Sequence, residues 1–167
     1  MSQGFRSPSD WSLMARTVAD ATDRGIRSAR AHDGGDFAEA VEILGVHADA
    51  ARAVHAHMVR ELIETAYQDG LDSDDVADVL TRTVADATGW DAPVDPTAVA
   101  VVLTGALGVN EPADPGDAGT PASSASQVIG AAILVAARLT TDTGVDHGDY
   151  LTRAVEEIRR AQTVEMP

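Results

Sequence analysis

Two apolar runs constrain the fold of this chain more than any other feature. They are AVAVVLTGALGV at 98–109 and VIGAAILVAA at 128–137. Each is too short to cross a bilayer, which needs about 20 apolar residues. A helix that is apolar on nearly all sides must be covered from several directions. The runs therefore predict two central core helices in a water-soluble bundle, with no membrane partner.

The composition favours helices over a β-sandwich. Hydrophobic residues make up 44% of the chain but aromatic residues only 4%, so Ala, Val, Leu and Ile must fill the core. Strands prefer bulky β-branched and aromatic side chains, whereas small residues suit close-packed helices. A chain of 167 residues has the length of one ordinary domain. We predict a single all-α domain over 1–167, a bundle of about six helices.

Helix start signals divide the chain into these elements. SPSD predicts Ser7 as an N-cap with Pro8 in the first turn, and a first helix that ends near residue 31. Asp36 is expected to cap a long second helix down to Tyr67, unless Gly45 interrupts it. The later predictions are a third helix from Asp72 to Gly89, a fourth opened by Asp95 and Pro96 and ending at Val109, a fifth over 125–142, and a sixth opened by Asp146 or Asp149. Residues 110–124 are rich in Pro, Gly, Ala and Ser, which predicts a flexible loop.

A heptapeptide occurs twice. RTVADAT stands at 16–22 and at 82–88, and RTVADATGWD at 82–91 is echoed by RLTTDTGVD at 138–146. These echoes predict two related helical hairpins, 74–108 and 126–162. Ancient duplication and chance in a biased composition both remain open.

The charge of the chain restricts its partners. The formal net charge is −15, and all 12 basic residues are Arg. A lysine-free acidic composition fits either GC-rich coding bias or salt adaptation. Negative charge repels nucleic acid and anionic membranes, so a basic protein or a metal cation is the expected partner. A DNA mimic, which presents carboxylates in place of phosphates, is a further hypothesis.

Other classes are excluded by what the sequence lacks. The chain has no Cys, so it has no disulfides and no thiolate metal site. Its first residues contain no apolar segment typical of secretion, which predicts a cytoplasmic protein. No nucleophile elbow, phosphate loop or dinucleotide fingerprint is present. No catalytic residue or cofactor-binding motif is therefore assigned.

Three of the five histidines are clustered in HADAARAVHAH. On a helix His47 and His55 share nearly one face, while His57 lies on another, so the three cannot bind one metal. We expect core or solvent-facing histidines. The alternative is pH sensing through His55 and His57.

Four carboxylates form the sharpest candidate site. Glu61 and Glu64 are three residues apart on the second predicted helix, and Asp75 and Asp78 repeat that spacing on the third. If these helices form an antiparallel pair, the four acids meet and need a divalent cation to neutralise them. Here the chain resembles the MazG-like all-α nucleotide pyrophosphatases, although Arg60 stands where the family has its first glutamate. The resemblance implies that Glu61, Glu64, Asp75 and Asp78 hold Mg²⁺ while water attacks a nucleotide phosphate.

Three functions follow from these observations. The first is a non-enzymatic, acidic cytoplasmic module that binds a protein, as a regulator, adaptor, immunity-type inhibitor or assembly factor, and that forms homo-oligomers. The alternative is the Mg²⁺-dependent pyrophosphatase. The third is the DNA mimic.

Overall fold

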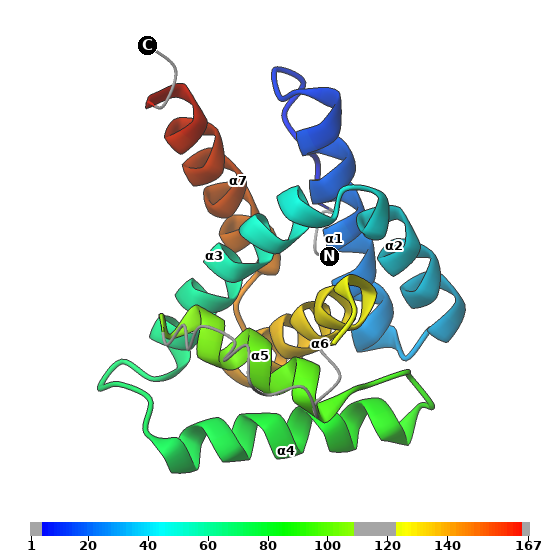
Figure 1. Ribbon diagram of the computed structural model, residues 1–167, viewed down its shortest axis with the longest axis vertical. Helices are drawn as coiled ribbons and strands as arrows, with labels where there is room; N and C mark the ends of the chain where they lie inside the picture. Colours follow the sequence, from blue (N-terminus) through cyan, green and yellow to red (C-terminus); the bar gives the residue numbers. More distant parts are fainter. Residues whose placement is uncertain (1–4, 109–122, 165–167) are drawn as a thin grey trace, which may run out of the picture.

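The computed structural model describes residues 5–108 and 123–164, and its regular elements in those ranges are all helices (Figure 1). This confirms the all-α prediction, with seven helices where about six were expected. They are α1 (Leu13–Ala31), α2 (Gly34–Val46), α3 (Ala48–Ala66), α4 (Ser73–Gly89), α5 (Pro96–Ala106), α6 (Ala125–Thr143) and α7 (His147–Val164).

The additional helix arises because the predicted long second helix is broken. His47 has φ −119° and ψ 47°, outside the helical region, and it separates α2 from α3. The apolar sides of the two helices are then free to face different neighbours. α2 packs mainly on α1, and α3 packs mainly on α6 and α7. The prediction of one continuous helix down to Tyr67 was therefore wrong.

Two predicted N-caps lie a few residues from the observed ones. Ser12, not Ser7, caps α1, and its Oγ accepts a hydrogen bond from the backbone N–H of Ala15 at 3.1 Å. Asp33, not Asp36, caps α2, and its Oδ1 accepts from the N–H of Asp36 at 3.1 Å. In both places two residues of the preferred capping type stand close together, so the local pattern alone did not select between them.

The other caps agree with the sequence pattern. Asp72 and Asp75 form a reciprocal capping box at the start of α4, with N···O distances of 2.8 and 3.1 Å. Asp95 caps α5 and Pro96 is in its first turn. The second carboxylate oxygen of Asp95 accepts from Ser123 Oγ at 2.9 Å, which ties the start of α5 to the residue before the N-cap of α6.

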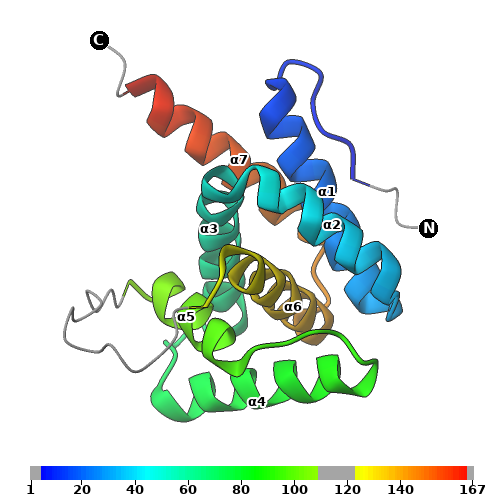
Figure 2. The same ribbon diagram turned by 45° about the vertical axis from the view of Figure 1, so that its right-hand side comes forward.

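α6 is the centre of the fold. It contacts α1, α2, α3, α4 and α5, and residues 129–137 are all buried. Figures 1 and 2 show the other helices arranged around it. The prediction that 128–137 is a core helix is confirmed, and one chain supplies the coverage. No helix within 5–108 and 123–164 combines the length and apolar character needed to cross a membrane.

α5 is not covered in the same way. Val99 and Leu103 are buried, but Val101 is 44% exposed and Leu107 39% exposed. α5 packs on α6, α3 and α4 with one side and leaves the other side open. The expectation that 98–109 is equally central was therefore wrong, and Val109 itself lies outside the described residues.

The two predicted hairpins are arranged differently. α4 and α5 contact each other, whereas α6 is capped at its C-terminus by Gly144 and α7 turns away to pack on α3 and α1 (Figure 2). The segments 74–108 and 126–162 are therefore similar in part of their sequence, but their helices pack differently. The predicted flexible loop at 110–124 lies outside the described residues except for Ser123 and Ser124.

α1 approaches α6 closely at Gly25. A Cβ atom at this position would lie 2.8 Å from Ile133 Cδ1 and 3.3 Å from Ile133 Cγ2. Both residues are buried, so little space is available for Ile133 to move. We expect Gly25→Val to overpack this contact and lower the free energy of unfolding by about 1–3 kcal/mol.

Urea unfolding followed by circular dichroism measures this loss. Gly89→Ala is the matched control, because nothing lies within 4 Å of a Cβ built at Gly89. Equal stability of the Gly25→Val variant and the control would contradict the close packing of α1 on α6.

Candidate functional site

The four candidate metal ligands do not lie together. The turn after α3 carries α4 onto α5 and α6 instead of back along α3, so the expected antiparallel pair is not formed. Each carboxylate has its own partner: Glu61 accepts from Arg153 at 3.1 Å, Glu64 from Arg60 at 3.4 Å, Asp78 from Arg82 at 3.0 Å, and Asp75 from the N–H of Asp72 at 3.1 Å. In the part of the chain that the structure describes, no group of three His, Asp or Glu side chains is placed to hold a metal ion.

The clustered histidines are also separated. His47 is the junction between α2 and α3, His57 is partly exposed, and His55 is buried with 2% of its surface exposed. Burial lowers the pKa of His55 from its ordinary value of 6.5 to about 4. His55 is therefore neutral near pH 7, and the idea that its charge changes near neutrality is not supported.

His55 has one polar contact and lacks another. Its Nε2 lies 2.8 Å from Thr22 Oγ1 on α1, in a buried position. Its Nδ1 is buried and has no hydrogen-bond partner among the described residues. A buried polar atom without a partner carries a free-energy cost of about 1–3 kcal/mol.

The proton on the His55 ring can be assigned by counting partners. If Nε2 donates to Thr22, the Thr22 hydroxyl hydrogen and the Nδ1 lone pair are both left without a partner. If the Thr22 hydroxyl donates to Nε2, only the N–H at Nδ1 is left. The second arrangement leaves fewer polar groups unsatisfied. The neutral ring therefore carries its proton on Nδ1, as a free donor.

The lowered pKa of His55 makes stability depend on pH. Between about pH 6.5 and pH 4 the unfolded chain binds a proton at His55 and the folded chain does not. The stabilisation from keeping this histidine neutral is fully present above pH 6.5 and is lost as the pH falls through 4. We expect the free energy of unfolding to fall over this window by up to about 3 kcal/mol more in the wild type than in His55→Asn.

Urea unfolding at several pH values within that window provides the measurement. His57→Asn is the matched control, because it removes a histidine of the same helix that is partly exposed. The assignment fails if His55→Asn and the wild type lose stability in parallel as the pH falls.

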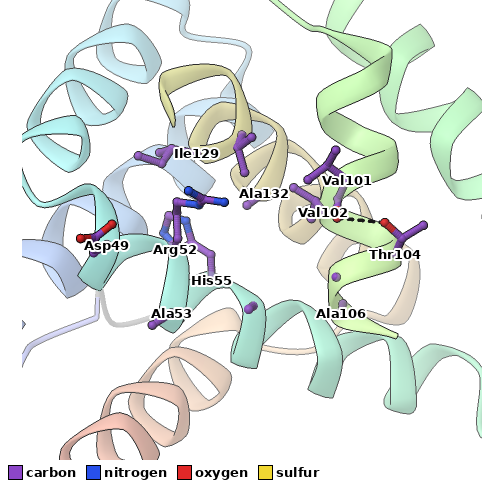
Figure 3. A pocket seen from close by; sticks show the side chains of 13 residues that line it. Asp49, Arg52, Ala53, His55, Val101, Val102, Thr104, Ala106, Ile129 and Ala132 are labelled. Atoms are coloured by element: carbon purple, nitrogen blue, oxygen red, sulfur yellow. Dashed lines mark hydrogen bonds between the residues drawn. The ribbon is translucent and has the colours of Figure 1, made fainter. Parts of the chain in front are cut away.

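His55 also lines a cavity among the described residues. The cavity has a volume of about 820 Å³ and lies between α3, α5 and α6 (Figure 3). Its walls are mainly Ala, Val and Ile side chains. Four of the residues that line it are polar or charged: Asp49, Arg52 and His55 from α3, and Thr104 from α5. The Thr104 hydroxyl is already satisfied, since it donates to the carbonyl of Ala100 at 2.9 Å.

Among the described residues, Arg52 is the only cation that lines this cavity. It is exposed and makes no ion pair or hydrogen bond within the described ranges 5–108 and 123–164. In Figure 3 its side chain extends from α3 toward Ile129 and Ala132 of α6, while Asp49 lies at the end away from α5. Arg52 and His55 are three residues apart on α3, so they share one face of that helix.

A second cavity is smaller and has no cation. Its volume is about 390 Å³, and Phe37, Val41 and Gly130 are among the residues that line it. The one charged residue in its lining is Asp95, whose carboxylate caps α5. The cavity at Arg52 is therefore the candidate site.

One further buried polar group is structural. Asp23 on α1 accepts from Arg27 at 2.9 Å and lies 2.7 Å from Nε2 of His147, the first residue of α7. Both Asp23 and His147 are buried, and together they fix the start of α7 against α1. Neither residue lines a described cavity.

The sequence alone did not identify Arg52 and His55 as residues that line a cavity. Arg52 gave no signal, because a single Arg on a helix is ordinary. His55 was noticed, but its hydrogen bond to Thr22 joins residues 33 positions apart. The three-residue spacing of Arg52 and His55 was the one local sign that they share a helix face.

No protein-family model, curated protein or solved structure matches this chain. What the site can bind is therefore inferred from the residues that line it.

Proposed function

We propose that this chain is a non-catalytic module that binds another protein, and that the partner presents a basic surface. The observation that carries this proposal is the distribution of ion pairs. Within residues 5–108 and 123–164, eight of the 12 arginines are paired with carboxylates, so their positive charge is not free to balance the remaining acids. The eight are Arg24, Arg27, Arg60, Arg82, Arg138, Arg153, Arg159 and Arg160.

The turn between α3 and α4 is a strong example of the surplus acid. This turn and the first turn of α4 contain Asp69, Asp72, Asp74 and Asp75, none of which forms an ion pair in the described part of the chain. Asp72 and Asp75 are occupied by the capping box of α4, but Asp69 and Asp74 face solvent. Exposed carboxylates without cations attract a basic partner and raise its rate of association.

The polar contacts within the protein support binding over catalysis. In the described part of the chain, a hydroxyl lies beside a histidine ring nitrogen, as in a nucleophile with its base, at Thr22 and His55. Thr22 is fully buried and does not line either described cavity, so no substrate reaches its hydroxyl. The hydrogen bond instead joins α1 to α3.

A pull-down from native lysate tests the proposal. We expect wild-type protein to retain a basic protein that elutes as salt is raised, because screening weakens attraction between exposed charges. The double variant Asp69→Asn, Asp74→Asn should retain less of the same protein. Asp20→Asn with Glu42→Gln is the matched control, since it removes the same charge from exposed positions on α1 and α2. Recovery of no protein partner would count against the proposal.

Self-association is part of the same proposal, but fewer residues support it than the apolar runs of the sequence suggested. α6 is covered within one chain, so its burial does not require a second copy. The large apolar side chains exposed in the described residues are Leu13, Met14, Val46, Val101 and Leu107. These are the positions available for a contact between copies.

Light scattering over a wide range of protein concentration measures this association. We expect a mass above that of one 17.3 kDa chain, and a fall toward that mass in the variant Leu13→Asp, Val46→Asp. Those two residues are 80% and 77% exposed, so the substitutions leave the core intact. A strictly monomeric wild type would rule out self-association.

The nucleotide pyrophosphatase and the DNA mimic remain predictions from the sequence. No specific contact favours either, and the acids on which the first depends are engaged separately. The protein-binding module is therefore the function that we put forward.

A further inference from the structure

We propose that a second copy of this chain docks on the open side of α5 in an antiparallel arrangement, with Val101 of each copy seated over Gly105 of the other. This inference rests on the self-association proposed above and names a face on which two copies meet.

Val101 and Gly105 form a projection and a gap on one helix face. They are four residues apart on α5, so they lie on the same side of that helix. Val101 is 44% exposed, whereas nothing lies within 4 Å of a Cβ atom built at Gly105. Both residues line the cavity of about 820 Å³, and Figure 3 shows Val101 at its α5 wall. A two-fold axis between the two positions places each Val101 against Gly105 of the other copy, because such an axis makes both copies exchange the same pair of residues.

The charge of the chain selects the occupant. Among the helices within 5–108 and 123–164, α5 is the only one without an Asp, Glu, Arg or His residue. Asp49 and Arg52, which line the same cavity, have opposite charges and together add no net charge there. Two chains of net charge −15 repel each other wherever their acidic surfaces meet. Two copies of α5 meet without bringing like charges together, whereas a basic partner finds no carboxylate on this helix to bind.

The polar groups beside this face already have partners. The hydroxyl of Thr104 donates to the carbonyl of Ala100 at 2.9 Å. At the start of α5, the carboxylate of Asp95 accepts from the N–H of Thr97 at 3.2 Å and from the hydroxyl of Ser123 at 2.9 Å. Covering Val101 with a second copy therefore removes apolar surface from water without leaving these groups unpaired.

Light scattering in the Leu13→Asp, Val46→Asp background isolates the α5 contact. That background removes the two most exposed large apolar side chains of the described residues, which lie on α1 and α2. We expect it to retain the mass of two chains, and Val101→Asp added to it to give the mass of one, because a buried carboxylate would face a second acidic copy. Met14→Asp is the matched control, since Met14 is 45% exposed but lies on α1, and it should leave the two-chain mass unchanged.

Gly105→Leu tests the shape of the contact without adding charge. The new side chain occupies the gap that receives Val101 of the second copy, so the mass should again fall to that of one chain. The fold itself should be preserved, since the position is open and Leu favours a helix more than Gly does. Gly89→Leu is the matched control, because Gly89 is equally open but lies at the end of α4. Circular dichroism of each variant checks that it remains folded.

Disulfide cross-linking tests the antiparallel arrangement. The chain contains no Cys, so introduced cysteines are its only thiols. Mild oxidation of a mixture of the Val101→Cys and Gly105→Cys proteins should link two copies, because the two positions face each other across the contact. A mixture of Met14→Cys and Gly105→Cys should not be linked.

Salt separates this contact from the capture of a basic partner. Added salt screens the repulsion between two acidic copies, so the α5 dimer should become tighter while retention of a basic protein becomes weaker. A strictly monomeric wild type would reject self-association as a whole. The α5 contact alone is wrong if the wild type associates but the Leu13→Asp, Val46→Asp background is monomeric. It is equally wrong if Val101→Asp and Gly105→Leu leave the two-chain mass of that background unchanged.

Discussion

The burial of α6 by five other helices is the contact on which the rest of the structure depends. Its residues from Ile129 to Ala137 have no exposed side, so each neighbouring helix must turn an apolar face inward. Small side chains make this possible. At Gly25 the backbone of α1 comes so close to Ile133 that a Cβ would not fit without movement. Each fully buried Ile or Leu contributes about 1.5–3 kcal/mol relative to exposure, so a helix surrounded in this way anchors the fold.

The candidate site arises where that coverage is incomplete. α5 packs against α6 with one side only, and the cavity lies between it, α3 and the start of α6 (Figure 3). A second buried helix would have closed this space. Instead the open side of α5 exposes Val101, and Arg52 extends over apolar walls without an ion-pair partner in the described residues. The charge of Arg52 is therefore available to a ligand, unlike that of the arginines held in ion pairs.

The two copies of the repeated heptapeptide lie in different environments in the fold. Thr22 and Thr88 end the two copies of RTVADAT, but Thr22 is buried beside His55 whereas Thr88 is exposed. Arg82 in the second copy reaches Asp142 of α6, a residue 60 positions away, and also Asp78. Glu61 shows the same effect, because its partner Arg153 comes from α7, 92 positions away in the chain. The role of a charged residue here follows from its neighbours in space.

Local chemistry was enough to predict the helical class, the buried helix at 128–137 and the caps at Asp72 and Asp95. Capping and periodicity act over a few residues, so their signals are contiguous in the sequence. The break at His47, the half-covered α5 and the separation of Glu61 from Asp78 depended on which faces pack together, and packing joins residues far apart in the chain. The same is true of Arg52 and His55: the sequence determined that they share a helix face, and only the tertiary structure decided that this face lines a cavity.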